Sequence, residues 1–154
     1  MKGMRIWKKT LAFVIAACIV LSATAVFAAP EYIGSGAAGN TSGLITITNP
    51  NAQKIHTLEK TYYVAGYGIS DVRVYFYSFN GSSYQMMRSY GAPVSLTIGA
   101  SGLFMKKVTL KDGKNNLLIR AEDYHGRVQH AYHEITLVDQ GIRDYVNGRI
   151  FPGA

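Results

Sequence analysis

The sequence predicts an all-β protein, a two-sheet antiparallel sandwich of seven or eight strands that follows an N-terminal signal-peptide helix. Two observations carry this prediction. Between residues 44 and 138, apolar residues recur at alternate positions in short runs, and Gly, Pro, Asn and Asp interrupt the runs at short intervals. This region has no convincing helical period. A sheet with one apolar face must bury that face against another layer, so a sandwich follows.

In the first half of this region we expect strands at residues 44–48, 61–65, 72–77, 84–88 and 94–98. Asn49-Pro50 ends the first of them, because Pro donates no hydrogen bond to a ladder. Asn80-Gly81 makes a turn, which lets the strand after it return antiparallel to the strand before it.

The stretch from Gly102 to Gly126 gathers Lys, Asp, Glu, Tyr and His, and it is either a reactive site or a pair of strands. Its apolar residues share even spacing, at positions 104, 108, 110, 117, 119 and 121. We interpret it as a hairpin whose turn lies at residues 111–114, with Gly113 permitting the turn. After a second turn at 124–126, the last strand carries Ala131, His133, Ile135 and Leu137 at alternate positions.

Several short patterns follow one another in a fixed order: Tyr62-x-Val64-x-Gly66, Val72-x-Val74-x-Phe76, and Gly113-x-Asn115-x-Leu117-x-Ile119-x-Ala121-x-Asp123. This order resembles bacterial immunoglobulin-like domains, such as domain B of glucodextranase and related repeats of exported surface proteins. The resemblance covers about residues 45–138. It implies an immunoglobulin-like sandwich without catalytic activity, used as a spacer, an adhesion unit or an accessory to carbohydrate-active enzymes. The Cys-Trp-Cys core of antibody domains is absent.

Residues 1–28 are typical of a secretory signal peptide. Four basic residues within the first nine precede an apolar run, and small residues precede a cleavage site between Ala28 and Ala29. Two alternatives stay open: a lipobox that ends at Cys18, and an uncleaved anchor formed by residues 11–29. The apolar run after Cys18 and the weak hydrophobicity of the segment favour cleavage. We therefore expect an exported protein, secreted or held at the envelope.

Cleavage divides the chain into three further parts: a flexible Gly/Ala/Ser-rich linker at 29–43, the folded domain at 44–138 and a tail at 139–154. The tail retains apolar residues, so packing on the domain, docking to a partner and a disordered end all stay open. Membrane contact is expected only through the N-terminal segment, if it is uncleaved or lipidated.

Charge and cysteine content exclude several function classes. The chain has a formal net charge of +7, but removing the four basic residues of the signal segment from 16 Lys and Arg leaves 12, against 9 Asp and Glu. A surplus this small, spread along the chain, predicts no nucleic-acid partner. Cys18 is the single cysteine, so a cleaved chain has neither thiol chemistry nor disulfides, and its hydrophobic core must stabilise it.

We expect no catalytic, cofactor-binding or metal-binding site. His130 and His133 are three residues apart, which places them on opposite faces of a strand. Glu122 and Asp123 are neighbours and diverge on a strand, so they do not form the carboxylate pair of a glycosidase. Asp123 is expected instead to accept hydrogen bonds from turn amides.

The high tyrosine content, 11 residues, gives the best candidate for a contact patch. Arg73, Tyr75 and Tyr77 lie on one strand face, opposite Val74 and Phe76, and rings with polar tips suit contact with sugars or proteins. Tyr63 is likewise expected to project from the face opposite Val64. We expect a non-enzymatic module with a structural, adhesion or protein-interaction role, whose partner is an unknown protein or a cell-wall glycan. The alternative is a carbohydrate-binding accessory protein that uses exposed tyrosines.

Overall fold

The computed structural model describes residues 29–138 and residue 141, and the predictions about the signal segment, Cys18 and the tail fall outside these residues. Twelve strands form in the described part of the chain: β1 (Tyr32–Gly34), β2 (Ile45–Asn49), β3 (Lys54–Thr57), β4 (Thr61–Gly68), β5 (Arg73–Phe79), β6 (Ser83–Met86), β7 (Arg88–Ser89), β8 (Ala92–Pro93), β9 (Ser95–Thr97), β10 (Leu103–Thr109), β11 (Gly113–Glu122) and β12 (Val128–Leu137). No helix among these residues is long and apolar enough to cross a membrane.

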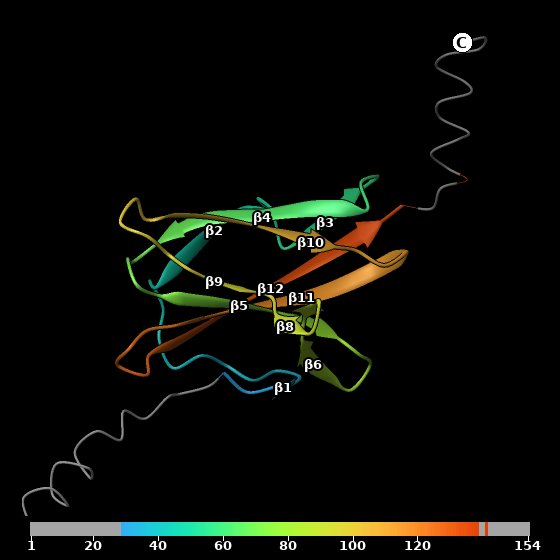
Figure 1. Cartoon of the computed structure of the whole chain (residues 1–154). Helices are drawn as coiled ribbons and strands as arrows, with labels where there is room; N and C mark the ends of the chain where they lie inside the picture. The colour runs from blue at the N-terminus through green and yellow to red at the C-terminus, as the bar shows by residue number, and fades with distance from the viewer. Residues whose placement is uncertain (1–28, 139–140, 142–154) are drawn as a thin grey trace, which may run out of the picture.

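The strands form a β-sandwich of a large and a small sheet (Figure 1). The large sheet has the order β1-β6-β5-β11-β12-β3, and β9 pairs with the first half of β5. The small sheet has the order β10-β4-β2, while β7 and β8 form a separate ribbon. The all-β prediction is confirmed, but the described residues form twelve strands instead of the expected seven or eight, because strands as short as β7 and β8, with two residues each, show no apolar period. The expectation of a purely antiparallel sandwich is wrong at one place, because β3 runs parallel to β12.

The hydrophobic core lies between the two sheets and follows the alternation expected from the sequence. The large sheet contributes Val74 and Phe76 from β5, and the small sheet contributes Val64 and Val108; all four are buried. Burying side chains of this size contributes about 1.5–3 kcal/mol each, so the core can stabilise the domain without a disulfide.

β3 was not predicted from the sequence, because its four residues show no apolar alternation. As expected, β2 ends at Asn49-Pro50, where the Asn49 carboxamide oxygen accepts a hydrogen bond from the Tyr62 hydroxyl at 2.6 Å. The chain then leaves the small sheet and adds β3 to the edge of the large one, beside β12. One segment of sequence therefore ties both sheets together.

The hairpin expected between residues 102 and 126 is wrong, although its turn is correct. Gly113 adopts φ +80°, and the Asn115 side chain closes the corner by accepting from Lys111 N at 2.8 Å and donating to Lys111 O at 2.7 Å. However, β10 pairs with β4 in the small sheet, whereas β11 pairs with β5 and β12 in the large one. Leu117, Leu118 and Ile119 are all buried, so β11 needs a neighbour on each side and cover on both faces.

Residues 29–43, expected to be a flexible linker, contain β1 and pack against the large sheet. We call residues 29–41 the strap. β1 pairs with β6, and the strap then runs over the face of the large sheet that points away from the small sheet (Figure 1). Thr41 N donates to Val128 O at 3.1 Å. A Cβ on Gly39 would lie 2.4 Å from Val128 O, so only glycine permits this approach to β12.

Candidate functional site

The contact patch expected at Arg73, Tyr75 and Tyr77 does not form an open surface. The three residues alternate along β5 as expected, and Arg73 is exposed, but Tyr75 is half-buried and Tyr77 is fully buried. The Tyr77 hydroxyl donates to Pro30 O in the strap at 2.8 Å, and burial raises the pKa of Tyr77 well above its usual range. The strap covers the Tyr77 ring. The sequence pattern of β5 alone does not predict this cover.

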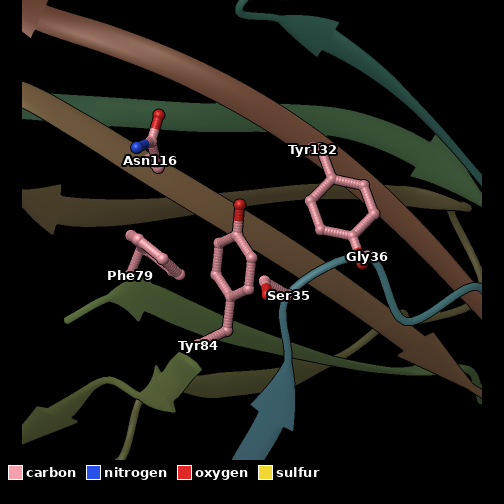
Figure 2. Close-up of a pocket in the computed structure, with 6 residues that line it drawn as sticks. All are labelled: Ser35, Gly36, Phe79, Tyr84, Asn116 and Tyr132. Atoms are coloured by element: carbon pink, nitrogen blue, oxygen red, sulfur yellow. The ribbon is translucent and has the colours of Figure 1, made fainter. Parts of the chain in front are cut away.

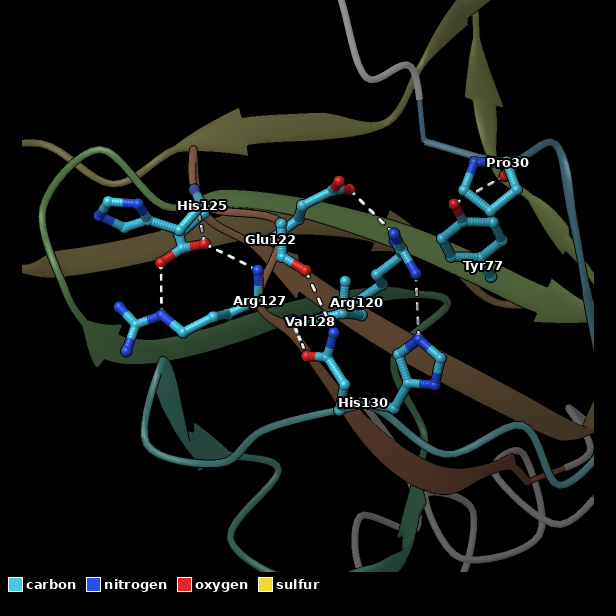
Figure 3. A network of polar contacts seen from close by, with 11 residues as sticks. Pro30, Tyr77, Arg120, Glu122, His125, Arg127, Val128 and His130 are labelled. Carbon is cyan, nitrogen blue, oxygen red and sulfur yellow. Dashed lines mark hydrogen bonds and ion pairs between the residues drawn. The ribbon is translucent and has the colours of Figure 1, made fainter. Parts of the chain in front are cut away.

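Beside Tyr77 lies a closed polar network (Figure 3). Arg120 and Glu122 form an ion pair at 3.0 Å, with only 14% and 12% of their side chains exposed. His130 Nδ1 lies 2.9 Å from Ala37 O, and because a carbonyl only accepts, this nitrogen carries the proton. His130 Nε2 is then the acceptor for Arg120 Nη1 at 3.4 Å. The network fastens the strap to β12, although Arg120 Nε is buried and has no hydrogen-bond partner among the described residues.

The acidic neighbours Glu122 and Asp123 diverge as expected. Asp123 accepts from His125 N at 3.0 Å, from Arg127 N at 2.9 Å and from Arg127 Nε at 2.7 Å. Burial acts to raise the pKa of Asp123, but these bonds and the Arg127 charge outweigh it, so the pKa is lowered. The prediction that Asp123 accepts turn amides is confirmed, and its role is to hold the β11–β12 turn (Figure 3).

The histidines lie apart from one another. His130 belongs to the network under the strap, whereas His133 Nδ1 makes a contact of 3.1 Å with Ala52 O on the segment before β3. Within the described residues, no three His, Cys, Asp or Glu side chains are grouped closely enough to hold a metal ion.

A groove opens on the outer face of the large sheet, next to the strap (Figure 2). Its first part has a volume of about 370 Å³ and is lined by Ser35, Gly36, Phe79, Tyr84, Asn116 and Tyr132. Its second part, about 210 Å³, shares Tyr84, Asn116 and Tyr132 and continues to Gln53, Lys54, His133 and Glu134. We call the two parts together the aromatic groove. The first part alone falls within the range of roughly 300–1,000 Å³ that is typical of ligand pockets.

Three rings form one wall of the aromatic groove. The ring centroids of Phe79 and Tyr84 are 5.2 Å apart, and those of Tyr84 and Tyr132 are 5.4 Å apart with near edge-to-face geometry. The Tyr132 hydroxyl donates to Ala37 O, which fixes this ring against the strap. Burial raises the pKa of both Tyr84 and Tyr132, so their phenols stay protonated at neutral pH.

The sequence did not predict the groove, because its residues come from five strands and the strap. A signal was nevertheless present for Tyr132, which alternates with core-facing Ala131 and so belongs to the outer face of β12. Tyr84 could be placed only after β6 was known to pair with both β5 and β1.

The outer face of the small sheet is the second surface of interest. Four large apolar side chains share it, and each is about half exposed or more: Tyr63 (47%), Tyr67 (51%), Leu103 (67%) and Met105 (64%). We call them the small-sheet face. Leu103 lies opposite Tyr67 in the β10–β4 register, and Met105 lies opposite Ala65 between the two tyrosines, so the four side chains are contiguous. Tyr63 was expected to project away from Val64, and its exposure confirms this.

Comparisons with known proteins leave the family unassigned. No protein-family model matches the chain, and no curated protein matches its sequence. Among solved structures, the crystal structure of CopC from Methylosinus trichosporium OB3b is similar, with 14% sequence identity and a TM-score of 0.35. The match covers 62% of this chain and 93% of that chain. Identity and TM-score this low give no ground for transferring a function from CopC to this chain.

Proposed function

We propose that this chain is an exported, non-enzymatic immunoglobulin-like module that docks onto another protein at the bacterial envelope through its small-sheet face. The observation that carries the proposal is the contiguity of Tyr63, Tyr67, Leu103 and Met105 on a sheet face that no described residue covers. Contiguous exposed apolar groups of this kind mark interaction sites, whereas single exposed apolar residues do not.

The immunoglobulin-like assignment is supported by the topology. β2 and β3 are consecutive in sequence but belong to different sheets, and β3 pairs in parallel with the last strand, β12. The two sheets hold the core between them in the manner of such sandwiches. Export is supported by the signal-peptide pattern of residues 1–28.

A non-enzymatic role is supported by the polar groups of the described residues. Glu122 is paired with Arg120, and Asp123 is satisfied by Arg127 and turn amides, so neither carboxylate faces an open cavity together with a second acid or a base. Reaction chemistry needs such groups to converge on one reacting atom. Docking needs only a complementary surface.

The free energy available from burying these side chains suits docking. Full burial of a Leu or Met side chain contributes about 1.5–3 kcal/mol, and Leu103 and Met105 are each about two-thirds exposed before any partner arrives. The neighbouring tyrosines add rigid rings that lose little conformational entropy on binding. Lys107, which lies opposite Tyr63, would sit at the margin of such a contact.

Site-specific photocrosslinking in the natural host tests this function. A crosslinking residue at Met105 should yield one defined protein adduct, and Leu103→Ser should abolish it. Ser82, exposed in the β5–β6 turn, provides the matched control position and should yield no such adduct. Equal adducts from both positions, or none from Met105, would contradict docking through the small-sheet face.

A further inference from the structure

The aromatic groove is a second surface, separate from the small-sheet face because it lies on the outer side of the opposite sheet. Its lining residues come in order from β6, β5, β11, β12 and β3, so it crosses five neighbouring strands. At about 4.8 Å between strands, the backbones that supply these residues span roughly 19 Å, and the Tyr84 ring leans across them to within 5.4 Å of the Tyr132 ring. A ligand that fills it is elongated rather than compact.

The wall of the aromatic groove suits the apolar face of a sugar ring. The faces of aromatic rings carry negative potential, and the axial C–H groups of a pyranose are weakly positive, so the two stack well. Phe79, Tyr84 and Tyr132 stand in a row with neighbouring centroids 5.2 and 5.4 Å apart. The rings are inclined to one another by 53° and 62°, so each ring offers a separate contact to a sugar unit rather than one continuous platform.

The polar groups of the aromatic groove are available to a ligand. Neither the Asn116 carboxamide nor the Tyr84 hydroxyl makes a hydrogen bond to any described residue, although both side chains are half-buried. A purely apolar ligand, such as an acyl chain, would cover both groups without satisfying them, and a buried polar group without a partner weakens binding. A ligand with its own donors and acceptors avoids this cost.

Charge favours a neutral ligand. The charged residues that line the groove are Lys54 and Glu134, which approach each other to 4.0 Å, and Glu134 also pairs with Lys114 at 3.2 Å. The single acidic side chain of the lining is therefore already neutralised. A cationic ligand therefore finds no unopposed carboxylate here, and the one surplus positive charge is the exposed Lys54 ammonium at the end of the second part.

We propose that the aromatic groove binds an elongated glycan whose pyranose units carry acetamido groups. The Asn116 carboxamide offers an N–H donor and a C=O acceptor side by side, which matches the C=O and N–H of an acetamido substituent. Phe79 lines the same part of the groove and gives the acetamido methyl group an apolar contact. The rings hold the sugar backbone, and Asn116 selects the substituent.

Two hexasaccharides with the same β-1,4 backbone test the proposal: chitohexaose, which has acetamido groups, and cellohexaose, which lacks them. Isothermal titration calorimetry with the purified chain should give at least tenfold tighter binding of chitohexaose, because a hydrogen-bond pair to a ligand group is lost with cellohexaose. Absence of chitohexaose binding, or equal affinity for the two sugars, overturns the proposal.

Variants locate the site within the molecule. Tyr84→Ala should weaken chitohexaose binding at least tenfold, and Asn116→Ala should bring it down to the cellohexaose level. Asn116 makes no side-chain hydrogen bond to the described residues, so its variant should keep the melting temperature even if Tyr84→Ala fails to fold. The matched tyrosine control is Tyr67→Ala, on the other sheet, which should bind chitohexaose normally. Unchanged binding by Asn116→Ala overturns the role of the carboxamide.

Docking through the small-sheet face and glycan binding in the aromatic groove can be refuted independently of each other. Tyr84→Ala and Asn116→Ala leave the small-sheet face intact, so they should leave the Met105 adduct unchanged. Leu103→Ser removes that adduct and should leave sugar binding unchanged.

Discussion

Gly39 provides the sharpest test of how the strap is held. Its replacement by Ala would place the new Cβ 2.4 Å from Val128 O and 2.9 Å from Gln129 Cα, both backbone atoms that cannot rotate away. The φ angle of Gly39 is not positive, so Ala can adopt its conformation and the effect is steric. The strap must therefore move away from β12.

Movement of the strap breaks five hydrogen bonds made by residues 37–41: Ala37 O with His130 and with Tyr132, Thr41 N with Val128 O, Val128 N with the Asn40 side chain, and the Asn40 side chain with Gly126 O. Each contributes about 1 kcal/mol net, and overpacking itself costs about 1–3 kcal/mol. Partial relaxation reduces the sum. We expect Gly39→Ala to lose about 2–4 kcal/mol of unfolding free energy, with a melting temperature roughly 10–20 °C lower.

Urea denaturation and amide hydrogen exchange measure the outcome. Exchange should rise first in β1 and at Thr41, before the core strands change. Gly34 in the same segment is the matched control, since no atom lies within 4 Å of a Cβ built there and its φ is not positive. Gly34→Ala should cost less than about 0.5 kcal/mol. Equal stability of the two variants would refute the packing of the strap described here.

Three further substitutions test the corner between β10 and β11, the strap, and the turn between β11 and β12. Asn115→Ala removes both side-chain bonds to Lys111 and should cost about 2–3 kcal/mol in urea denaturation; a loss below about 0.5 kcal/mol would show that the corner does not depend on them. Tyr77→Phe removes the 2.8 Å bond to Pro30 O and should cost about 1 kcal/mol and speed amide exchange in β1; unaltered exchange would count against that bond holding the strap. The pKa of Asp123 is lowered in the folded state, so its stabilisation is present above the unfolded pKa of about 4 and is lost as the pH falls through the folded pKa. The stability difference between the wild type and Asp123→Asn should therefore shrink below about pH 4, and a constant difference between neutral and strongly acidic pH would contradict this linkage.

The strands that face one buried surface could be predicted from the sequence. β5 shows why: Val74 and Phe76 alternate with larger polar-tipped residues, and both are buried in the core as expected. The same reasoning located β10 and the turn at Gly113. Which strands pair with one another was harder to predict. The continuous apolar run from Leu117 to Ile119 indicates a central strand but does not indicate which strands lie beside it.

The candidate sites were less predictable because they depend on what covers each sheet. Tyr77 shows the same alternation as an exposed residue, yet the strap, some 45 positions earlier in the sequence, buries it. Tyr84 and Asn116 meet in the aromatic groove only through the order of the large sheet. Tyr63, in contrast, was placed correctly, since nothing among the described residues covers the small-sheet face.

The strap also gives the domain a mechanical property. A pulling force on its N-terminal side acts first on the Pro30 contact with Tyr77 and then on β1, an edge strand of three residues that pairs with β6. The hydrogen bonds between β1 and β6 would break one after another, before the force reaches the core between the sheets. Ser35 and Gly36 form part of the aromatic groove, so tension would dismantle the groove while the small-sheet face stays intact. Stretching the domain would therefore release a glycan bound in the aromatic groove and retain a protein bound to the small-sheet face.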